Sequence, residues 1–128
     1  QCCFPEGLHV LLVDDVELNR FVAAEMLKSM GAEVSQADGG KNTLLQLQRH
    51  SYDLVLLDVS MDDIDGLEVA RRVRKQYKLK LPIIALTAHA TPDMKQQCLE
   101  AGMNDFVSKP FRYEELYEAI TRQMSKVT

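Results

Sequence analysis

Five polar side chains of this sequence stand at the ends of short apolar segments: Asp14, Asp15, Asp58, Thr87 and Lys109. Carboxylates that lie close together repel one another and raise each other's pKa, and a bound cation relieves that repulsion. Oxygen ligands alone select a hard ion, and Mg²⁺ typically binds a few carboxylates, waters and a phosphate oxygen. The set is therefore suited to a divalent cation and to phosphoryl chemistry.

Within this set, Asp58 is the best candidate nucleophile. A carboxylate can attack phosphorus and form an aspartyl phosphate. Asp58 stands alone, whereas Asp14 and Asp15 are adjacent and better suited to hold a metal. Phosphoryl transfer needs mainly positioning and charge neutralisation, so Mg²⁺ can serve one phosphoryl oxygen, Lys109 a second and the Thr87 hydroxyl a third. A single Asp after a strand is more often a turn former or a helix N-cap, so the hypothesis depends on the whole set.

The elements that must bring these side chains together alternate along the chain. Short runs rich in Leu and β-branched residues are typical of strands buried on both faces, and we expect strands at residues 8–13, 33–36, 54–57, 82–86 and 105–108. Between them we expect helices at 17–30, 42–47, 67–76, 92–101 and from Tyr113 onward. This alternation predicts a parallel sheet with helices on both faces. Ligands of such sheets bind beyond the carboxyl ends of the strands, where the polar set would meet.

Local signals set the ends of several of these helices. Thr91 followed by Pro92 is typical of an N-cap and first turn, and Gly31 and Gly102 are stop signals. In the first helix, apolar residues repeat every four positions at Leu18, Val22, Met26 and Met30.

The composition is that of one globular domain. The chain has 128 residues, 46% of them hydrophobic and 27% charged, with a net charge of −4. A mildly acidic chain is a poor candidate for nucleic-acid binding. No apolar run approaches the roughly 20 residues that span a bilayer, and residues 1–7 lack the features of a signal peptide. We therefore expect a cytoplasmic domain without membrane contact, and a linker or tail at residues 1–7. The cysteines show no pairing pattern and are expected to be reduced.

The sequence resembles the receiver family of response regulators in two-component signalling. The resemblance covers residues 8–126 and is carried by five motifs in order: Leu11–Asp15, Asp53–Asp58, Asp65–Gly66, Ala85–Ala88 and Lys109–Phe111. It implies a flavodoxin-like (βα)5 domain, a doubly wound five-stranded parallel sheet with strand order 2-1-3-4-5. It also implies that the domain catalyses only its own phosphorylation and dephosphorylation, with a phosphohistidine as donor.

The resemblance implies a role for each site residue. Asp58 would be the phosphoacceptor, and Mg²⁺, for which Mn²⁺ can substitute, would be held by Asp15, Asp58 and the backbone carbonyl of Ser60. Asp14 would act on the metal mostly through a bound water. Lys109 would bridge to the phosphoryl group.

The resemblance also implies a switch. Thr87 would swing towards the phosphoryl group, and Phe106 would fill the space that it leaves. The surface formed by the fourth helix, the fifth strand and the fifth helix would report the change. The Lys109–Pro110 peptide bond is expected to be cis.

The sequence departs from the family pattern after Met61, where Asp62 replaces the usual Pro. With Asp63 and Asp65 this makes an acidic loop, which is simply solvated, perturbs metal affinity or reduces docking of a phosphodonor. The residues in and around these motifs resemble those of receivers that are joined to hybrid sensor histidine kinases. The expected partners are a histidine kinase, a histidine phosphotransfer protein or both, and the domain is expected to be a monomer. A stand-alone regulator that acts by protein contact is the alternative to the hybrid kinase.

Two other functions fit the sequence less well. A phosphohydrolase with an aspartate nucleophile needs an acid two residues after that nucleophile, and Ser60 stands there. A protein-interaction module that is never phosphorylated would not need the full polar set, although the Asp62 departure leaves this alternative open.

Overall fold

Strands and helices alternate along the chain in the computed structural model, which describes residues 8–89 and 91–127. The strands are β1 (His9–Val13), β2 (Glu33–Ala37), β3 (Leu54–Asp58), β4 (Ile83–Thr87) and β5 (Asp105–Ser108). The helices are α1 (Glu17–Ser29), α2 (Gly40–Arg49), α3 (Gly66–Lys75), α4 (Pro92–Ala101) and α5 (Tyr113–Val127). The tail predicted at residues 1–7 lies outside the described residues, and the domain limits of 8–126 stay a prediction.

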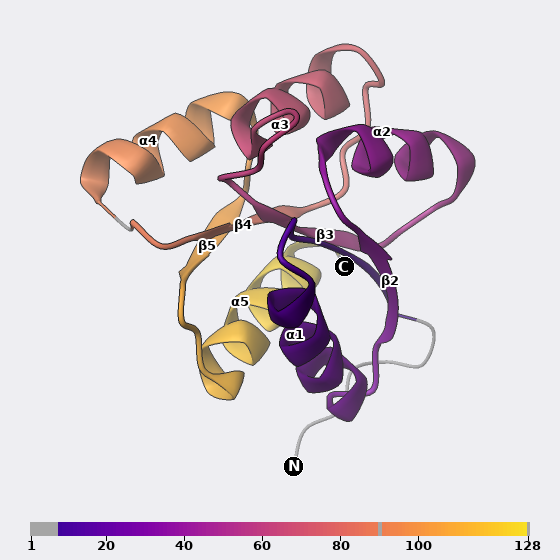
Figure 1. Cartoon of the computed structure of the whole chain (residues 1–128), viewed down its shortest axis with the longest axis vertical. Helices are drawn as coiled ribbons and strands as arrows, with labels where there is room; N and C mark the ends of the chain where they lie inside the picture. Colours follow the sequence, from indigo (N-terminus) through magenta and orange to yellow (C-terminus); the bar gives the residue numbers. More distant parts are fainter. Residues whose placement is uncertain (1–7, 90, 128) are drawn as a thin grey trace.

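The strands form one parallel sheet in the order β2-β1-β3-β4-β5. Helices α1 and α5 cover one face, and α2, α3 and α4 cover the other (Figure 1). The predicted doubly wound, flavodoxin-like fold and its strand order are confirmed. Among the described helices, none combines the length and the apolar character that a membrane crossing requires.

The register of the sheet brings the carboxyl ends of neighbouring strands to one level. Val13 of β1 pairs with Leu57 of β3. Asp14 and Asp58, which follow these two residues, are therefore neighbours. The ends of β4 and β5 are also paired with each other, so the polar residues at four strand ends share one edge.

Both faces of the sheet are buried, which explains why its inner strands are continuous apolar runs. In β3, Leu54 and Leu56 pack towards α1 and α5, whereas Val55 and Leu57 pack towards α2, α3 and α4. All four are at most 1% exposed, and burial of each contributes roughly 1.5–3 kcal/mol. Asp58 is thus the last residue of a strand that is enclosed on both sides.

The capping signals act as predicted at α4. The Thr91 hydroxyl accepts a hydrogen bond from the amide of Met94 at 3.1 Å, and Gly102 ends the helix with a φ of 102°. L side chains rarely adopt that conformation. Gly31, with a φ of 96°, likewise follows the end of α1.

Helix α1 buries only part of its four-residue apolar repeat: Met30, directly after the helix, is fully buried and Met26 packs against the core. Its buried residues are Ala23, Ala24 and Leu27, whereas Leu18 is 69% and Val22 44% exposed. Two alanines let the helix backbone approach the sheet closely, which leaves the larger side chains on its flank. There Leu18 and Val22 line a cleft of about 390 Å³ beside the strand ends.

Arg74, near the end of α3, joins two loops, the one between α3 and β4 and the one between α4 and β5. Its Nε donates to the carbonyl of Gly102 at 2.9 Å, and one Nη donates to the carbonyls of Leu79 and Leu81 at 2.9 and 2.8 Å. The other Nη donates to Asn104 Oδ1 at 2.7 Å. Burial lowers the pKa of the Arg74 guanidinium. The side chain is a structural tie between α3 and the segments that flank β4.

We predict that Arg74→Met lowers the free energy of unfolding by roughly 2–4 kcal/mol, because partly buried oxygens lose a charged donor. Arg71→Met is the matched control, since the Arg71–Glu68 pair is exposed and its loss should cost less than about 0.5 kcal/mol. Urea denaturation of both variants measures the difference. Equal midpoints would show that Arg74 ties nothing together.

Candidate functional site

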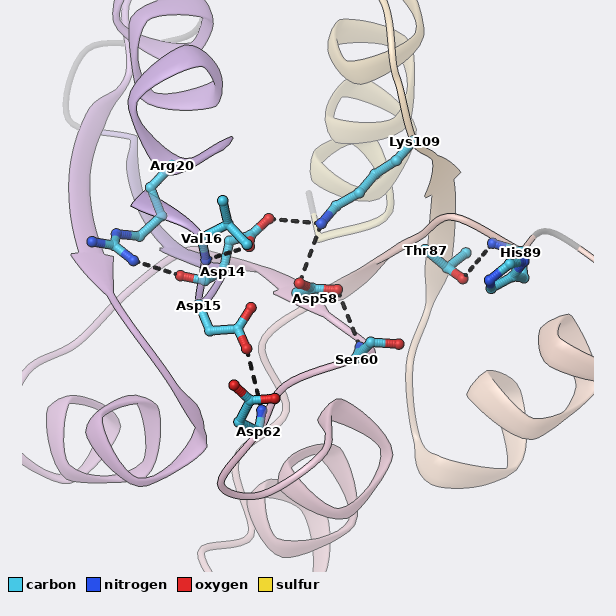
Figure 2. A network of polar contacts seen from close by, with 10 residues as sticks. All are labelled: Asp14, Asp15, Val16, Arg20, Asp58, Ser60, Asp62, Thr87, His89 and Lys109. Carbon is cyan, nitrogen blue, oxygen red and sulfur yellow. Dashed lines mark hydrogen bonds and ion pairs between the residues drawn. The ribbon is translucent and has the colours of Figure 1, made fainter. Parts of the chain in front are cut away.

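The carboxyl ends of four strands present polar side chains at one edge of the sheet (Figure 2). Asp14 follows β1, Asp58 and Thr87 end β3 and β4, and Lys109 follows β5. Asp14, Asp58 and Thr87 are only 2, 5 and 4% exposed. This edge is where sheets of this class bind ligands.

Lys109 links the two buried carboxylates. Its Nζ donates to Asp14 Oδ2 at 2.7 Å and to Asp58 Oδ2 at 3.2 Å. The Lys109 side chain is itself only 21% exposed, so solvent and salt screen these ion pairs weakly. The Lys109–Pro110 peptide bond is cis.

Backbone amides hold the other oxygen of each carboxylate. The amide of Val16 donates to Asp14 Oδ1 at 2.9 Å, and the amide of Ser60 donates to Asp58 Oδ1 at 3.1 Å. Each carboxylate therefore has an amide on one oxygen and the Lys109 ammonium on the other. This arrangement fixes the orientation of both groups before any ligand binds.

The three carboxylates form a set that can hold a metal ion. Asp14, Asp15 and Asp58 each offer an oxygen within 4.8 Å of the others. Asp15 is half-buried, and its Oδ2 accepts a hydrogen bond from the amide of Asp62 at 3.2 Å. An all-oxygen, triply acidic donor set fits a hard divalent cation such as Mg²⁺. The part of the Ser60 carbonyl in metal binding stays a prediction.

The charges of the site shift two pKa values upward. Burial, with the nearby charge of Asp14, raises the pKa of Asp58 to about 6, although the Lys109 ammonium and the Ser60 amide act in the opposite direction. For Lys109, burial favours the neutral amine, but its hydrogen bond to Asp14 and the charge of Asp58 outweigh that effect and raise its pKa. The ammonium therefore stays charged between the carboxylates.

Thr87 and Phe106 make contacts outside the network of Asp14, Asp58 and Lys109. The buried Thr87 hydroxyl accepts a hydrogen bond from the amide of His89 at 3.0 Å, and within the described residues no hydrogen bond joins it to Asp58. Phe106, on β5, is half-buried, with the ammonium of Lys95 from α4 4.7 Å from its ring centre. Their proposed motion as a switch stays a prediction.

Two supporting residues were not identified from the sequence. Arg20 donates to the backbone carbonyl of Asp14 at 2.7 Å, a contact without any sequence signal. Gly66 packs so closely against the backbone of Asp58 and Val59 that a Cβ would overlap both. The pairing of Asp65 with Gly66 marked the position, but only the structure shows that the end of β3 packs against it.

We predict that Asp58→Asn stabilises the metal-free protein at neutral pH. Because the folded pKa of Asp58 is about 6 against an ordinary 3.8, its contribution to stability is fully present below about pH 4 and is lost as the pH rises through 6. Asn carries no charge, so the variant should gain on the order of 1–3 kcal/mol over the wild type at pH 7.5. The gain should vanish towards pH 4.

Urea denaturation in EDTA from pH 4 to 7.5 measures this difference. Adding Mg²⁺ should stabilise the wild type more than the variant, since the ion needs the Asp58 charge. A stability difference that does not change with pH would contradict the assigned titration.

Comparisons with known proteins agree with this geometry. The family model described as "Response regulator receiver domain" matches residues 10–121. The chain is 42% identical to the aerobic respiration control sensor protein ArcB of Escherichia coli (strain K12) over 118 residues, which cover 91% of this chain and 15% of ArcB. It is 36% identical to the sensor histidine kinase RcsC of the same strain, covering 95% of this chain and 13% of RcsC. The chain thus spans a small part of these curated relatives.

Two solved structures share the fold and much of the sequence. One is the receiver domain of the sensor histidine kinase PA1611 from Pseudomonas aeruginosa PAO1, with a magnesium ion coordinated in its active site cleft. It has a TM-score of 0.85 and 36% identity, over 93% of this chain and 98% of that one. The other is chemotaxis protein CheY4 of Vibrio cholerae, with a TM-score of 0.85 and 33% identity, over 90% of this chain and 97% of that one. The chain belongs to the family of response regulator receiver domains.

Proposed function

We propose that this domain accepts a phosphoryl group on Asp58, from a phosphohistidine, in a reaction that depends on Mg²⁺. The observation that carries the proposal is the position of Lys109, whose ammonium contacts two buried carboxylates beside a third acidic group. A structural ion pair needs one carboxylate for each amine. Surplus buried negative charge next to a lysine is the arrangement expected of a site for a cation and an anion together.

The Asp58 carboxylate is suited to act as the nucleophile. With a pKa of about 6, it is mostly ionised at pH 7 and more basic than an ordinary Asp, which favours attack. Its oxygen would form a bond to phosphorus while the bond from phosphorus to the donor imidazole nitrogen breaks, and the imidazole would keep the electron pair. The Ser60 amide holds the Asp58 carboxylate in orientation during this exchange.

The charges of the phosphoryl oxygens would be neutralised by side chains that the site already contains. Lys109 would donate to one oxygen instead of to Asp58, and the Thr87 hydroxyl is available to donate to another, since its described hydrogen bond uses it as an acceptor. Asp14, Asp15 and Asp58 would hold Mg²⁺, which supplies electrostatic stabilisation of the transferring group. No residue offers acid catalysis two positions after Asp58, where Ser60 stands, so rapid hydrolysis of small phosphate esters is not expected.

The output would be a change at α4, β5 and α5. Movement of Thr87 towards a phosphoryl group would break its hydrogen bond with the His89 amide and so alter the connection from β4 to α4. Phe106 of β5 is half-buried next to α4, where the Lys95 ammonium lies over its ring. One added charge that biases two packings of this region is a sufficient signal.

The context that we propose is a longer sensor histidine kinase. The relatives that support it are several times longer than this chain. The partners would be the kinase region, a histidine phosphotransfer protein or both, in the cytoplasm, with the domain itself a monomer. The resemblance to CheY4 keeps a stand-alone regulator as the alternative.

We predict that acetyl phosphate and Mg²⁺ add one phosphoryl group to the wild type, and that Asp58→Asn abolishes the addition because the nucleophile is lost. Asp93→Asn, which removes an exposed acid from the first turn of α4, is the control and should react like the wild type. Intact-mass spectrometry with and without EDTA measures the product. Phosphorylation of Asp58→Asn at the normal rate would move the acceptor elsewhere, and no product in any sample would favour an interaction module.

We predict that Lys109→Met slows this phosphorylation by roughly 100-fold, because one preorganised donor to the phosphoryl oxygens is removed. Mg²⁺ affinity should not fall, since the variant also removes a competing cation from the carboxylates. Isothermal titration with Mg²⁺ and a phosphorylation time course separate the two effects. If Lys109→Met lost both Mg²⁺ binding and phosphorylation, the site would have collapsed, and the result would contradict a role for Lys109 solely as a donor to the phosphoryl oxygens.

A further inference from the structure

Helix α2 begins without a capping side chain of its own. Its N-cap residue is Gly39, which has no side chain to accept from the first amides of the helix. The carboxylate of Asp63, from the loop between β3 and α3, takes that place. Asp63 Oδ1 accepts from the amide of Gly40 at 3.0 Å, and Oδ2 accepts from the amide of Lys41 at 3.0 Å.

The same loop carries backbone groups that hold the acidic site. The amide of Ser60 donates to Asp58 Oδ1 at 3.1 Å, and the amide of Asp62 donates to Asp15 Oδ2 at 3.2 Å. Asp63 directly follows the residue that contacts Asp15. Whatever fixes Asp63 therefore limits how far the Asp62 amide can move from the Asp15 carboxylate.

The close approach of the loop and α2 is part of the packing. A Cβ on Gly40 would lie 2.8 Å from the Cβ of Ile64 and 2.9 Å from Cγ2 of Val69. A Cβ on Gly39 would lie 3.0 Å from both carboxylate oxygens of Asp63. Hydrogen bonds from the amides of Lys41 and Gly40 lower the pKa of Asp63, so its carboxylate stays charged and bound over the physiological range.

We propose that Asp63 is a positioning residue for the metal site: by binding the first amides of α2, it holds the loop that orients Asp15 and Asp58. This inference rests on the proposed Mg²⁺-dependent function. It differs from a purely structural helix cap, because it requires that loss of the Asp63 carboxylate weakens Mg²⁺ binding and not only the stability of α2. Mutation of a group that holds a metal ligand in orientation typically weakens metal binding by about 10-fold or more.

Asp62 provides a control for charge. It lies next to Asp63 in the same exposed loop, and within the described residues its carboxylate makes no hydrogen bond or ion pair. Asp62→Ala therefore removes the same charge at a similar place without touching α2. Any general effect of acidity on Mg²⁺ affinity is present in both variants.

Thr43 provides a control for helix stability. Its hydroxyl donates to the carbonyl of Gly39 at 2.8 Å in the first turn of α2, and within the described residues its side chain makes no hydrogen bond with Asp63. Thr43→Val should weaken the beginning of the helix while the loop keeps its Asp63 contact. Its Mg²⁺ affinity should equal that of the wild type.

The experiment is a Mg²⁺ titration of the wild type and of Asp63→Ala, Asp62→Ala and Thr43→Val, followed by amide NMR and by calorimetry. Asp63→Ala should bind Mg²⁺ about 10-fold more weakly than Asp62→Ala, and its Ser60 and Asp62 amide signals should shift before any metal is added. Asp63→Asn, which keeps one acceptor oxygen, should recover part of the affinity and serves if Asp63→Ala fails to fold.

The outcomes separate this inference from the proposed function. Equal Mg²⁺ affinities of Asp63→Ala and Asp62→Ala would overturn the positioning role and leave Asp63 as a helix cap. An equally large loss in Thr43→Val would also overturn it, since helix stability alone would then explain the effect. A wild type that binds no Mg²⁺ would overturn the proposed function together with this inference.

Discussion

The burial of like-charged carboxylates beside a single ammonium is the constraint on which the site depends. Asp14 and Asp58 are almost fully enclosed, and removal of an ion from water is costly unless it is paired and hydrogen-bonded. Lys109 pairs with both, and one backbone amide serves each remaining oxygen. The raised pKa of Asp58 shows that this compensation is incomplete. A divalent cation would offset both the cost of burying this charge and the smaller repulsion from Asp14.

The rest of the fold keeps that unfavourable arrangement in place. The carboxylates are fixed to the ends of strands whose apolar residues are packed on both faces, so they cannot separate without moving the core. Parallel register, rather than a flexible loop, brings Asp14 level with Asp58. Gly66 then allows the start of α3 to pack directly against the backbone of Asp58.

The acidic loop after Asp58 has two kinds of member. Asp63 and Asp65 are bound to helix N-termini, at α2 and α3 respectively, where a carboxylate is favoured by unpaired amides and the helix dipole. Asp62 replaces the usual Pro of the family and contributes its amide to Asp15, a bond that Pro cannot donate. The departure from the family pattern is therefore compatible with an ordered acidic site.

The sequence by itself determined the alternation of strands and helices, the helix signals at Thr91 and Gly102, and the polar residues at the strand ends. These features depend on local pattern: apolar runs, capping residues and the position at which each run stops. The tertiary structure alone decided that Asp63 binds the first amides of α2 and that Arg20 and Arg74 donate to backbone carbonyls outside their own helices. It also decided which face of α1 is buried. Those contacts join residues whose neighbours in space are set by the packing of the whole chain, and no local pattern carries that information.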